Sequence, residues 1–98
     1  MKAERLLDRR IVIADGAFVE IAWWRVPNPL QGCAHAFKFR MAYVVDGACV
    51  LRYDNETGKG DHRHEGGNES AIVFRSQRQM LADFANDVKR WNHENGRA

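Results

Sequence analysis

Ninety-eight residues, 45% hydrophobic and 29% charged, are typical of one folded domain spanning residues 1–98 and exclude a disordered chain. A net charge of only +2 excludes the strongly basic composition of a nucleic-acid coat protein. The longest apolar runs, "IVIA" and "MAYVV", are too short to cross a bilayer, and the charged N-terminus does not resemble a signal peptide. We therefore expect a cytoplasmic protein without a membrane segment. Cys33 and Cys49 form no Cys-x-x-Cys pair and are expected to be free thiols.

The first half of the chain predicts a β-hairpin. Two short β segments in "DRRIVIADGAFVEIAWWRV" flank Asp15-Gly16, a common hairpin turn. In the second segment Val19, Ile21 and Trp23 share one face, whereas Trp24 belongs to the other. The prolines of "PNPLQG" (27–32) then end the strand.

A second hairpin is predicted by "HAFKFRMAYVVDGACVLRYDN" (35–55), the clearest structural signal in the sequence. Large apolar residues alternate along its first strand with a period of two, and Asp46-Gly47 supplies the turn. The apolar set is Phe37, Phe39, Met41, Tyr43 and Val45. This set is expected to face the core.

The last third of the chain predicts a loop, a short strand and a helix. Residues 55–68 read as a Gly-rich polar loop with a possible extended piece at "DHRH", and "AIVF" (71–74) reads as a strand. "SQRQ" has the form of a capping box that opens a helix at Ser76. The helix continues to about residue 91 with an apolar stripe of Met80, Leu81, Phe84, Val88 and Trp91. The predicted fold is α+β, an antiparallel β-meander covered on one face by a C-terminal helix.

The sheet face opposite the apolar set carries candidate nucleic-acid-binding residues. Lys38, Arg40 and Arg52 are expected on this face, together with Trp24 if its strand pairs alongside. Cations beside an aromatic ring can hold phosphates and stack a base, although an ordinary solvated sheet face has the same composition.

The stretch "GKGDHRHEGG" (58–67) suggests acid–base chemistry. Residues 54–69 contain five carboxylates and two cations, and the carboxylates favour the protonated form of His62 and His64. A pair of imidazoles can cleave RNA through its 2′-hydroxyl without a metal, one as base and one as acid. Lys59 and Arg63 are the nearest candidates for stabilising the phosphorane charge.

Metal binding is the alternative chemistry for this stretch. In an extended segment His62 and His64 point to the same side, and Asp61 or Asp54 could add a carboxylate ligand. "CAH" (33–35) supplies another thiol and imidazole, but the spacing matches no standard zinc pattern. We therefore predict neither a metal nor any other cofactor.

Four stretches in order give the chain a family resemblance. They are "RIVIADGAFVEIAWWRVP", "HAFKFRMAYV", "LRYDNETGKGDHRH" and "FRSQRQMLADFANDV". Together they resemble the TumE family of toxins from toxin–antitoxin pairs over nearly the whole chain, and "YDN…GKGDHRH" is the most specific part. The positions that match the family pattern are His35, Lys38, Tyr53, Asp54, Lys59, Gly60, Asp61, His62, Arg63 and His64. Cys33 departs from it.

The resemblance implies a toxin that is neutralised by a helix-turn-helix antitoxin encoded next to it. Combined with the residues, it favours a toxin that acts on RNA by metal-independent cleavage. His62 and His64 are the predicted acid–base pair, and Asp61 or Asp54 is the predicted orienting carboxylate. His35, Tyr53 and Asp54 are expected to meet the histidine pair at one edge of the sheet. Two alternatives remain: a non-enzymatic module that binds an antitoxin or a nucleic acid, and a metal-dependent nuclease that uses His62 and His64.

Overall fold

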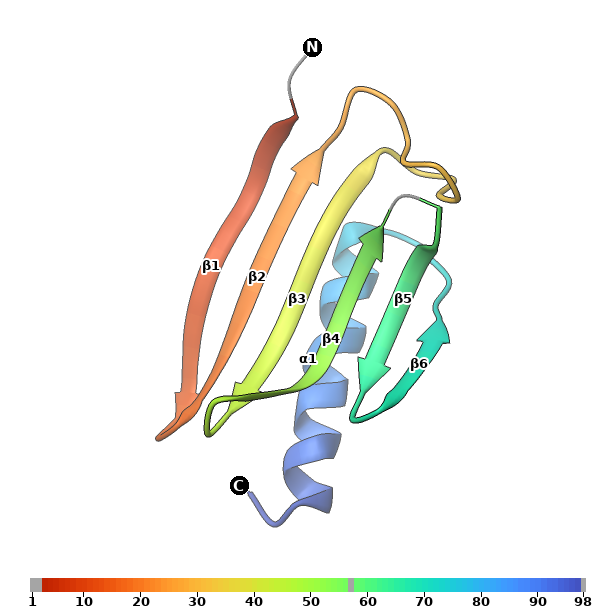
Figure 1. Cartoon of the computed structure of the whole chain (residues 1–98). Coiled ribbons are helices and arrows are strands. Elements are labelled where there is room, and N and C mark those ends of the chain that lie inside the picture. The colour runs from red at the N-terminus through yellow and green to blue at the C-terminus, as the bar shows by residue number, and fades with distance from the viewer. Residues whose placement is uncertain (1–2, 57, 98) are drawn as a thin grey trace.

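The computed structural model describes residues 3–56 and 58–97 and consists of a six-stranded sheet with one helix packed on it (Figure 1). The strands are β1 (Glu4–Ala14), β2 (Ala17–Arg25), β3 (Phe37–Val45), β4 (Ala48–Glu56), β5 (Gly60–Glu65) and β6 (Asn68–Ala71), and the helix is α1 (Gln77–Glu94). The strands follow one another across the sheet in chain order, and each pair is antiparallel. The predicted α+β meander with a C-terminal helix is confirmed.

Both predicted hairpins are present. β1 and β2 turn at Asp15-Gly16, and β3 and β4 turn at Asp46-Gly47. Asp46 and Gly47 have φ values of 50° and 83°, and positive φ at both central residues is the hallmark of the type I′ turn that matches strand twist. The Asp-Gly dipeptides therefore position the first four strands.

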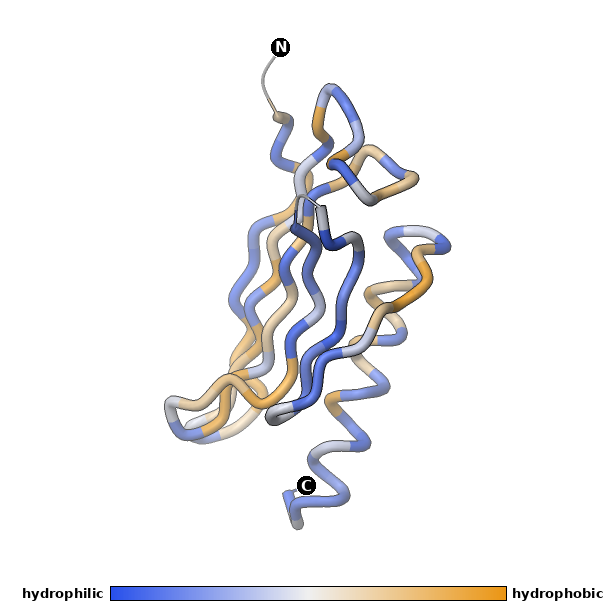
Figure 2. The backbone as a smooth tube through the Cα atoms, turned by 45° about the vertical axis from the view of Figure 1, so that its right-hand side comes forward, coloured by the Kyte–Doolittle hydropathy of each residue, from blue (hydrophilic) through white to orange (hydrophobic). Residues whose placement is uncertain are grey.

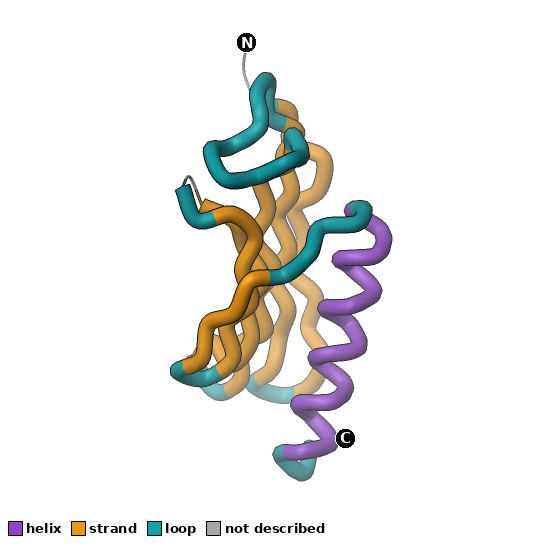
Figure 3. The backbone as a smooth tube through the Cα atoms, turned by 90° about the vertical axis from the view of Figure 1, so that its right-hand side faces the viewer, coloured by secondary structure: helices purple, strands orange, loops and turns teal. Residues whose placement is uncertain are grey.

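The core lies between the sheet and α1, on the face that the sequence predicted. Trp23, Phe39, Met41 and Tyr43 are fully buried, and the rings of Trp23 and Phe39 stack with centroids 4.6 Å apart. The helix contributes its predicted stripe, of which Met80, Phe84 and Val88 are buried and Leu81 and Trp91 partly buried. Figure 3 shows the two layers side by side.

The helix begins where the sequence predicted and ends one turn later. The Ser76 Oγ accepts a hydrogen bond from the Gln79 backbone N–H at 3.0 Å, so Ser76 is the N-cap. The Gln79 side chain donates to Asp83 instead of returning to the cap, so only half of the capping box forms. In the last turn Asn92 is buried and accepts a 2.6 Å hydrogen bond from the Tyr43 hydroxyl. This bond extends the helix contact beyond residue 91.

The loop predicted over residues 55–68 is too long, whereas the possible extended piece at "DHRH" is confirmed. Residues 60–65 form β5, which pairs with β4 along its whole length. Figure 2 shows that β5 and β6 are mainly hydrophilic, so they lack the apolar alternation by which the other strands were found. Backbone pairing with β4 stabilises β5 as a strand.

The strand predicted at "AIVF" is also misplaced. β6 ends at Ala71, and the following residues leave the edge of the sheet to reach α1. Ile72 and Phe74 pack against the core as the chain crosses to the helical layer. Burial of these apolar side chains therefore replaces strand pairing over residues 72–74.

Candidate functional site

The sheet face that α1 leaves uncovered brings together most of the predicted site residues. Residues directly opposite each other in an antiparallel pair project to the same side of the sheet. Across β3, β4 and β5, Arg40 is opposite Asp54, and Asp54 is opposite His62. In the next row Arg52 is opposite His64, which is opposite Glu69 of β6. We call this surface the open face.

His62 and His64 are neighbours on the open face, two residues apart on β5. Their ring centroids are 6.5 Å apart. The Nδ1 of His62 lies 3.2 Å from a Glu69 carboxylate oxygen, and the Nε2 of His64 lies 3.5 Å from Asp54 and 3.9 Å from Glu69. Each imidazole therefore has one nitrogen within ion-pair distance of a carboxylate.

Asp54 joins the histidines to the cations. Its Oδ2 lies 3.0 Å from the Nε of Arg52, and its side chain is only 12% exposed. The carboxylate thus lies within ion-pair distance of both a guanidinium and an imidazole. The predicted orienting role of Asp54 is therefore compatible with its position beside His64.

The predicted cations and Trp24 surround a depression on the same face. Trp24 is directly opposite Lys38, and the depression has a volume of about 430 Å³. Its lining includes Trp24, Lys38, Arg40, Arg52 and Asp54. The expectation that Lys38 and Arg40 lie on the face opposite the helix is confirmed. Lys59 is exposed in the turn that connects β4 to β5.

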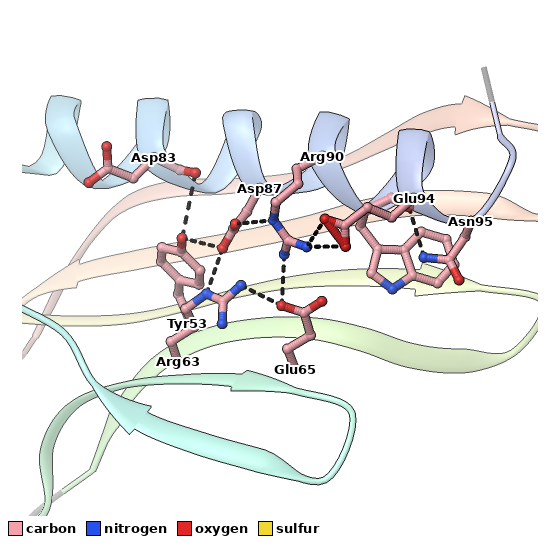
Figure 4. A network of polar contacts seen from close by, with 9 residues as sticks. Tyr53, Arg63, Glu65, Asp83, Asp87, Arg90, Glu94 and Asn95 are labelled. Carbon is pink, nitrogen blue, oxygen red and sulfur yellow. Dashed lines mark hydrogen bonds and ion pairs between the residues drawn. The ribbon is translucent and has the colours of Figure 1, made fainter.

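Tyr53 and Arg63 lie on the opposite, covered face, where they bind the helix (Figure 4). Both donate hydrogen bonds to the Oδ2 of Asp87 on α1, each at 2.7 Å. Arg63 also binds Glu65, which accepts a hydrogen bond from Arg90 at 2.7 Å. This polar network connects β4 and β5 to α1 through side chains that face away from the histidine pair.

Within this network the pKa of Asp87 is lowered and the pKa of Tyr53 is raised. Burial raises the pKa of Asp87, but hydrogen bonds from Arg63 and Tyr53 outweigh it and hold that pKa below its ordinary value of 3.8. Burial and the hydrogen bond to Asp87 both raise the pKa of Tyr53. The phenol of Tyr53 therefore stays protonated at neutral pH and donates to a charged carboxylate.

His35 and Asp61 form a separate cluster at one end of the covered face. The Nε2 of His35 lies 2.9 and 3.0 Å from the two Asp61 oxygens, and the Phe74 ring stacks on the imidazole at 3.9 Å. Cys33 Sγ lies 3.8 Å from Asp61, and burial followed by the Asp61 charge raises the pKa of this thiol. The expectation that His35 meets the other two histidines is wrong, because Asp61 and His62 are adjacent on a strand and face opposite sides.

Within the part of the chain that the structure describes, Cys33, His35 and Asp61 form a group that could hold a metal ion. Their potential ligand atoms lie within 4.8 Å of one another. However, the backbone N–H of Phe37 donates to the Nδ1 of His35 at 3.2 Å, which places the ring proton on Nε2, where it points at Asp61. Metal binding through Nε2 would move that proton to Nδ1, against the Phe37 N–H. The hydrogen bonds of His35 therefore favour a direct contact between its imidazole and Asp61 over a metal ion between them.

Two glycines hold this cluster against the start of β5. The Gln31 carbonyl accepts a 2.7 Å hydrogen bond from the Gly58 N–H. A Cβ on Gly60, whose φ is +76°, would lie 2.9 Å from the Gly32 carbonyl oxygen. Glycine is required where two backbones approach this closely. The "PNPLQG" and "GKG" segments thereby set the position from which β5 starts.

Glu69 is a site residue that the sequence analysis did not identify. It lies on β6, directly opposite His64, and its carboxylate approaches both imidazoles. Its position follows from the two-residue turn at Gly66-Gly67, a hairpin dipeptide that the sequence analysis treated as part of the polar loop because the flanking residues have no apolar period. Only the observed strand pairing reveals its contact with the histidines.

Fold and site together define a small α+β protein with paired histidines, cations and a tryptophan on an uncovered sheet face. A sequence model of the family described as "Toxin TumE" matches residues 2–92 of the 98-residue chain. The chain therefore belongs to the TumE toxin family. Membership makes it the toxin of a toxin–antitoxin system, with an antitoxin as its partner. A search among curated proteins and a search among solved structures gave no significant match.

In the part of the chain that the structure describes, no helix combines the length and apolar character needed to cross a bilayer.

Proposed function

We propose that this toxin cleaves RNA on the open face, with His62 and His64 as a metal-independent acid–base pair. The observation that supports the proposal most directly is the shared face of the two imidazoles and the cations. Arg52 and Arg40 lie in the same transverse rows as His64 and His62. An RNA strand lying along these rows would contact phosphate-binding groups and proton-transfer groups together.

The two histidines have different surroundings, which suggests different roles. His64 approaches two carboxylates, Asp54 and Glu69, which would offset the charge of an imidazolium that donates its proton. His62 approaches one carboxylate through Nδ1, which leaves Nε2 for proton abstraction. We therefore assign His62 as the base and His64 as the acid.

The proposed reaction needs no further reactant. His62 takes the proton of a 2′-hydroxyl, and the 2′-oxygen attacks the adjacent phosphorus. The bond from phosphorus to the 5′-oxygen breaks, and His64 gives its proton to that oxygen. The products are a 2′,3′-cyclic phosphate and a 5′-hydroxyl end. Arg52 and Arg40 would offset the negative charge that develops on the phosphoryl oxygens.

The remaining groups of the open face would bind the substrate. Trp24 and Lys38 are directly opposite each other, so a base can stack on the indole while the ammonium binds the next phosphate. Lys59, exposed in the turn from β4 to β5, could contact a phosphate further along the RNA strand. The proposed site of action is the cytoplasm, where RNA is available and an antitoxin can reach the toxin.

The test is cleavage of a defined RNA by purified protein in the presence of EDTA, with identification of both product ends. Cyclic phosphate and 5′-hydroxyl ends are expected, and His62→Gln and His64→Gln should each lower the rate at least 100-fold, because general acid–base groups contribute about 10²–10⁴. His93→Gln is the control, since His93 is exposed on α1. Growth arrest on induced expression should depend on the same two residues.

Two results would contradict the proposal. Folded His62→Gln and His64→Gln proteins that remain fully toxic would show that the histidines are not catalytic and would favour a non-enzymatic binding module. Cleavage that EDTA abolishes and that leaves 3′-hydroxyl ends would favour a metal-dependent nuclease.

A further inference from the structure

The single helix covers only part of the sheet. Adjacent strands are about 4.8 Å apart and a helix is about 10 Å wide, so one helix covers roughly two or three of six strands. In Figure 1, α1 lies behind β3 to β5, whereas β1 and β2 extend beside it without a helix behind them. The helical layer therefore has room for one more helix alongside α1.

An apolar groove occupies this position. Its volume is about 610 Å³, its floor is formed by Ile11, Ile13, Val19 and Ile21, and one wall is formed by α1. Ile11 and Ile13 are 41% and 43% exposed, although they lie on the same side of the sheet as the core. Isoleucine on the core side of a strand is normally covered. The groove is thus an unfilled part of the helical layer.

The α1 wall suits close approach of another helix. Leu81, Phe84 and Val88 contribute apolar surface, and the exposed Ala85 between them lacks a side chain that would hold a partner at a distance. Helices pack at axial distances of 8–10 Å depending on the size of the side chains at the contact. A small residue at the centre of the wall permits the shorter distance.

The charges around the groove select the partner. Its lining includes Lys89, His93 and Arg97, and no carboxylate is among the lining residues that the structure describes, although Arg97 lies 3.7 Å from the Asp46 carboxylate outside the groove. Arg9 adds a further cation, because it is directly opposite the groove residue Ile21 and so projects to the same side. An occupant with carboxylates beside an apolar stripe would match both the floor and the rim.

A second copy of the chain fits poorly on the same grounds. The exposed residues of α1 include Arg78 and Lys89, whereas the exposed carboxylate Glu94 is already paired with Arg90 at 2.8 Å, so docking α1 of one copy into the groove of another would bring cations together. RNA is disfavoured because the floor is apolar and offers phosphates no donor.

We propose that the groove between α1 and β1–β2 binds an acidic amphipathic helix of the antitoxin. The helix lies beside α1, buries its apolar stripe on Ile11, Ile13 and Ile21, and directs carboxylates at Lys89 and Arg97. This assignment rests on membership of the toxin family and not on RNA cleavage. It places antitoxin binding on the opposite side of the sheet from the histidine pair.

The test measures the affinity of the purified toxin for the purified antitoxin encoded next to it. Lys89→Glu reverses a groove charge at an exposed position, and Ala85→Glu adds a carboxylate and bulk to the wall. Each should weaken binding at least ten-fold while circular dichroism stays unchanged. Lys38→Glu on the open face is the matched control and should bind like wild type.

A second measurement uses fluorescein-labelled peptides of about 20 residues that tile the antitoxin. One peptide with an apolar stripe and flanking carboxylates should bind wild-type toxin and gain helical content, and replacing its carboxylates by lysine should restore binding to Lys89→Glu. The peptide assay tests the groove even if the intact antitoxin also contacts other surfaces.

Three results would overturn the assignment. The first is antitoxin binding that both groove variants leave unchanged. The second is loss of binding in Lys38→Glu alone, which would place the antitoxin on the open face. The third is a wild-type toxin dimer that Ala85→Glu converts to monomer, which would make a second copy the occupant. RNA cleavage by the groove variants is measured separately, so failure of the RNA proposal leaves this one intact.

Discussion

Replacing Asp87 by asparagine should remove the central acceptor of the network that joins the helix to the sheet. Asp87 accepts 2.7 Å hydrogen bonds from Tyr53 and Arg63, and its side chain is 16% exposed. Hydrogen bonds to a charged group contribute about 1.5–3 kcal/mol each. Asparagine retains one acceptor oxygen but no charge, and the contact with the more exposed Arg90 adds little. We therefore expect the free energy of unfolding to fall by about 2–4 kcal/mol.

The loss should depend on pH in a defined direction. The pKa of Asp87 is lowered in the folded state, so its contribution to stability is present above the ordinary value of 3.8. The contribution disappears as pH falls through the lower folded value. The stability difference between wild type and Asp87→Asn should thus be constant near neutral pH and shrink below about pH 4.

Urea unfolding followed by tryptophan fluorescence provides the measurement, because Trp23 is buried in the core and Trp91 partly buried beside it. Asp83→Asn is the matched control on the same helix, since the Asp83 carboxylate accepts a hydrogen bond only from Gln79 within the described residues. It should cost less than about 0.5 kcal/mol. Equal losses in the two variants, or a difference that does not shrink as pH falls below about 4, would refute the assignment of Asp87 as the helix anchor.

Four further outcomes are expected. Phe84→Ala should cost roughly 3–5 kcal/mol in the same unfolding assay, because it leaves a cavity in the core under the helix. Lys38→Ala should change folding by well under about 1 kcal/mol but weaken RNA binding in a salt-dependent titration; a large loss of stability would contradict its placement on the open face. Gly60→Ala should destabilise more than Gly58→Ala, since both have positive φ but only Gly60 approaches another backbone; similar melting temperatures would contradict that close contact. Elemental analysis should find no stoichiometric zinc in purified protein, whereas one metal per chain that is lost in Cys33→Ser would establish a metal site.

The histidine pair and the cations are residues whose sheet face can be predicted from strand alternation alone. Strand alternation assigns Lys38 and Arg40 to the face opposite Phe39 wherever β3 pairs, because successive side chains project to opposite sides. The same rule places His62 and His64 together as soon as their segment is extended. Neither result depends on knowledge of the neighbouring strands.

The composition of the site was harder to foresee because it depends on register. Asp61 and Arg63 are adjacent to the histidines in the chain, yet they face α1 and bind His35 and Asp87, which lie 26 and 24 residues away. Grouping residues by proximity in the sequence therefore merged two clusters that the sheet separates. Glu69 lies opposite His64 only because β6 pairs with β5 in this register.

The amino-acid sequence by itself determined the hairpins at Asp15-Gly16 and Asp46-Gly47, the apolar faces of β2 and β3, the helix capped by Ser76 and the TumE resemblance. These depend on turn chemistry, on periods of 2 and 3.6 residues and on a family motif, all of which are local. Only the tertiary structure decided that residues 60–65 are a strand, that His35 is separated from His62 and His64, and that a groove remains beside α1. A polar, glycine-rich segment carries no hydrophobic period, so hydrogen bonding to β4 selects its conformation. The width of six strands relative to one helix, in turn, leaves the core-side residues Ile11 and Ile13 of β1 exposed.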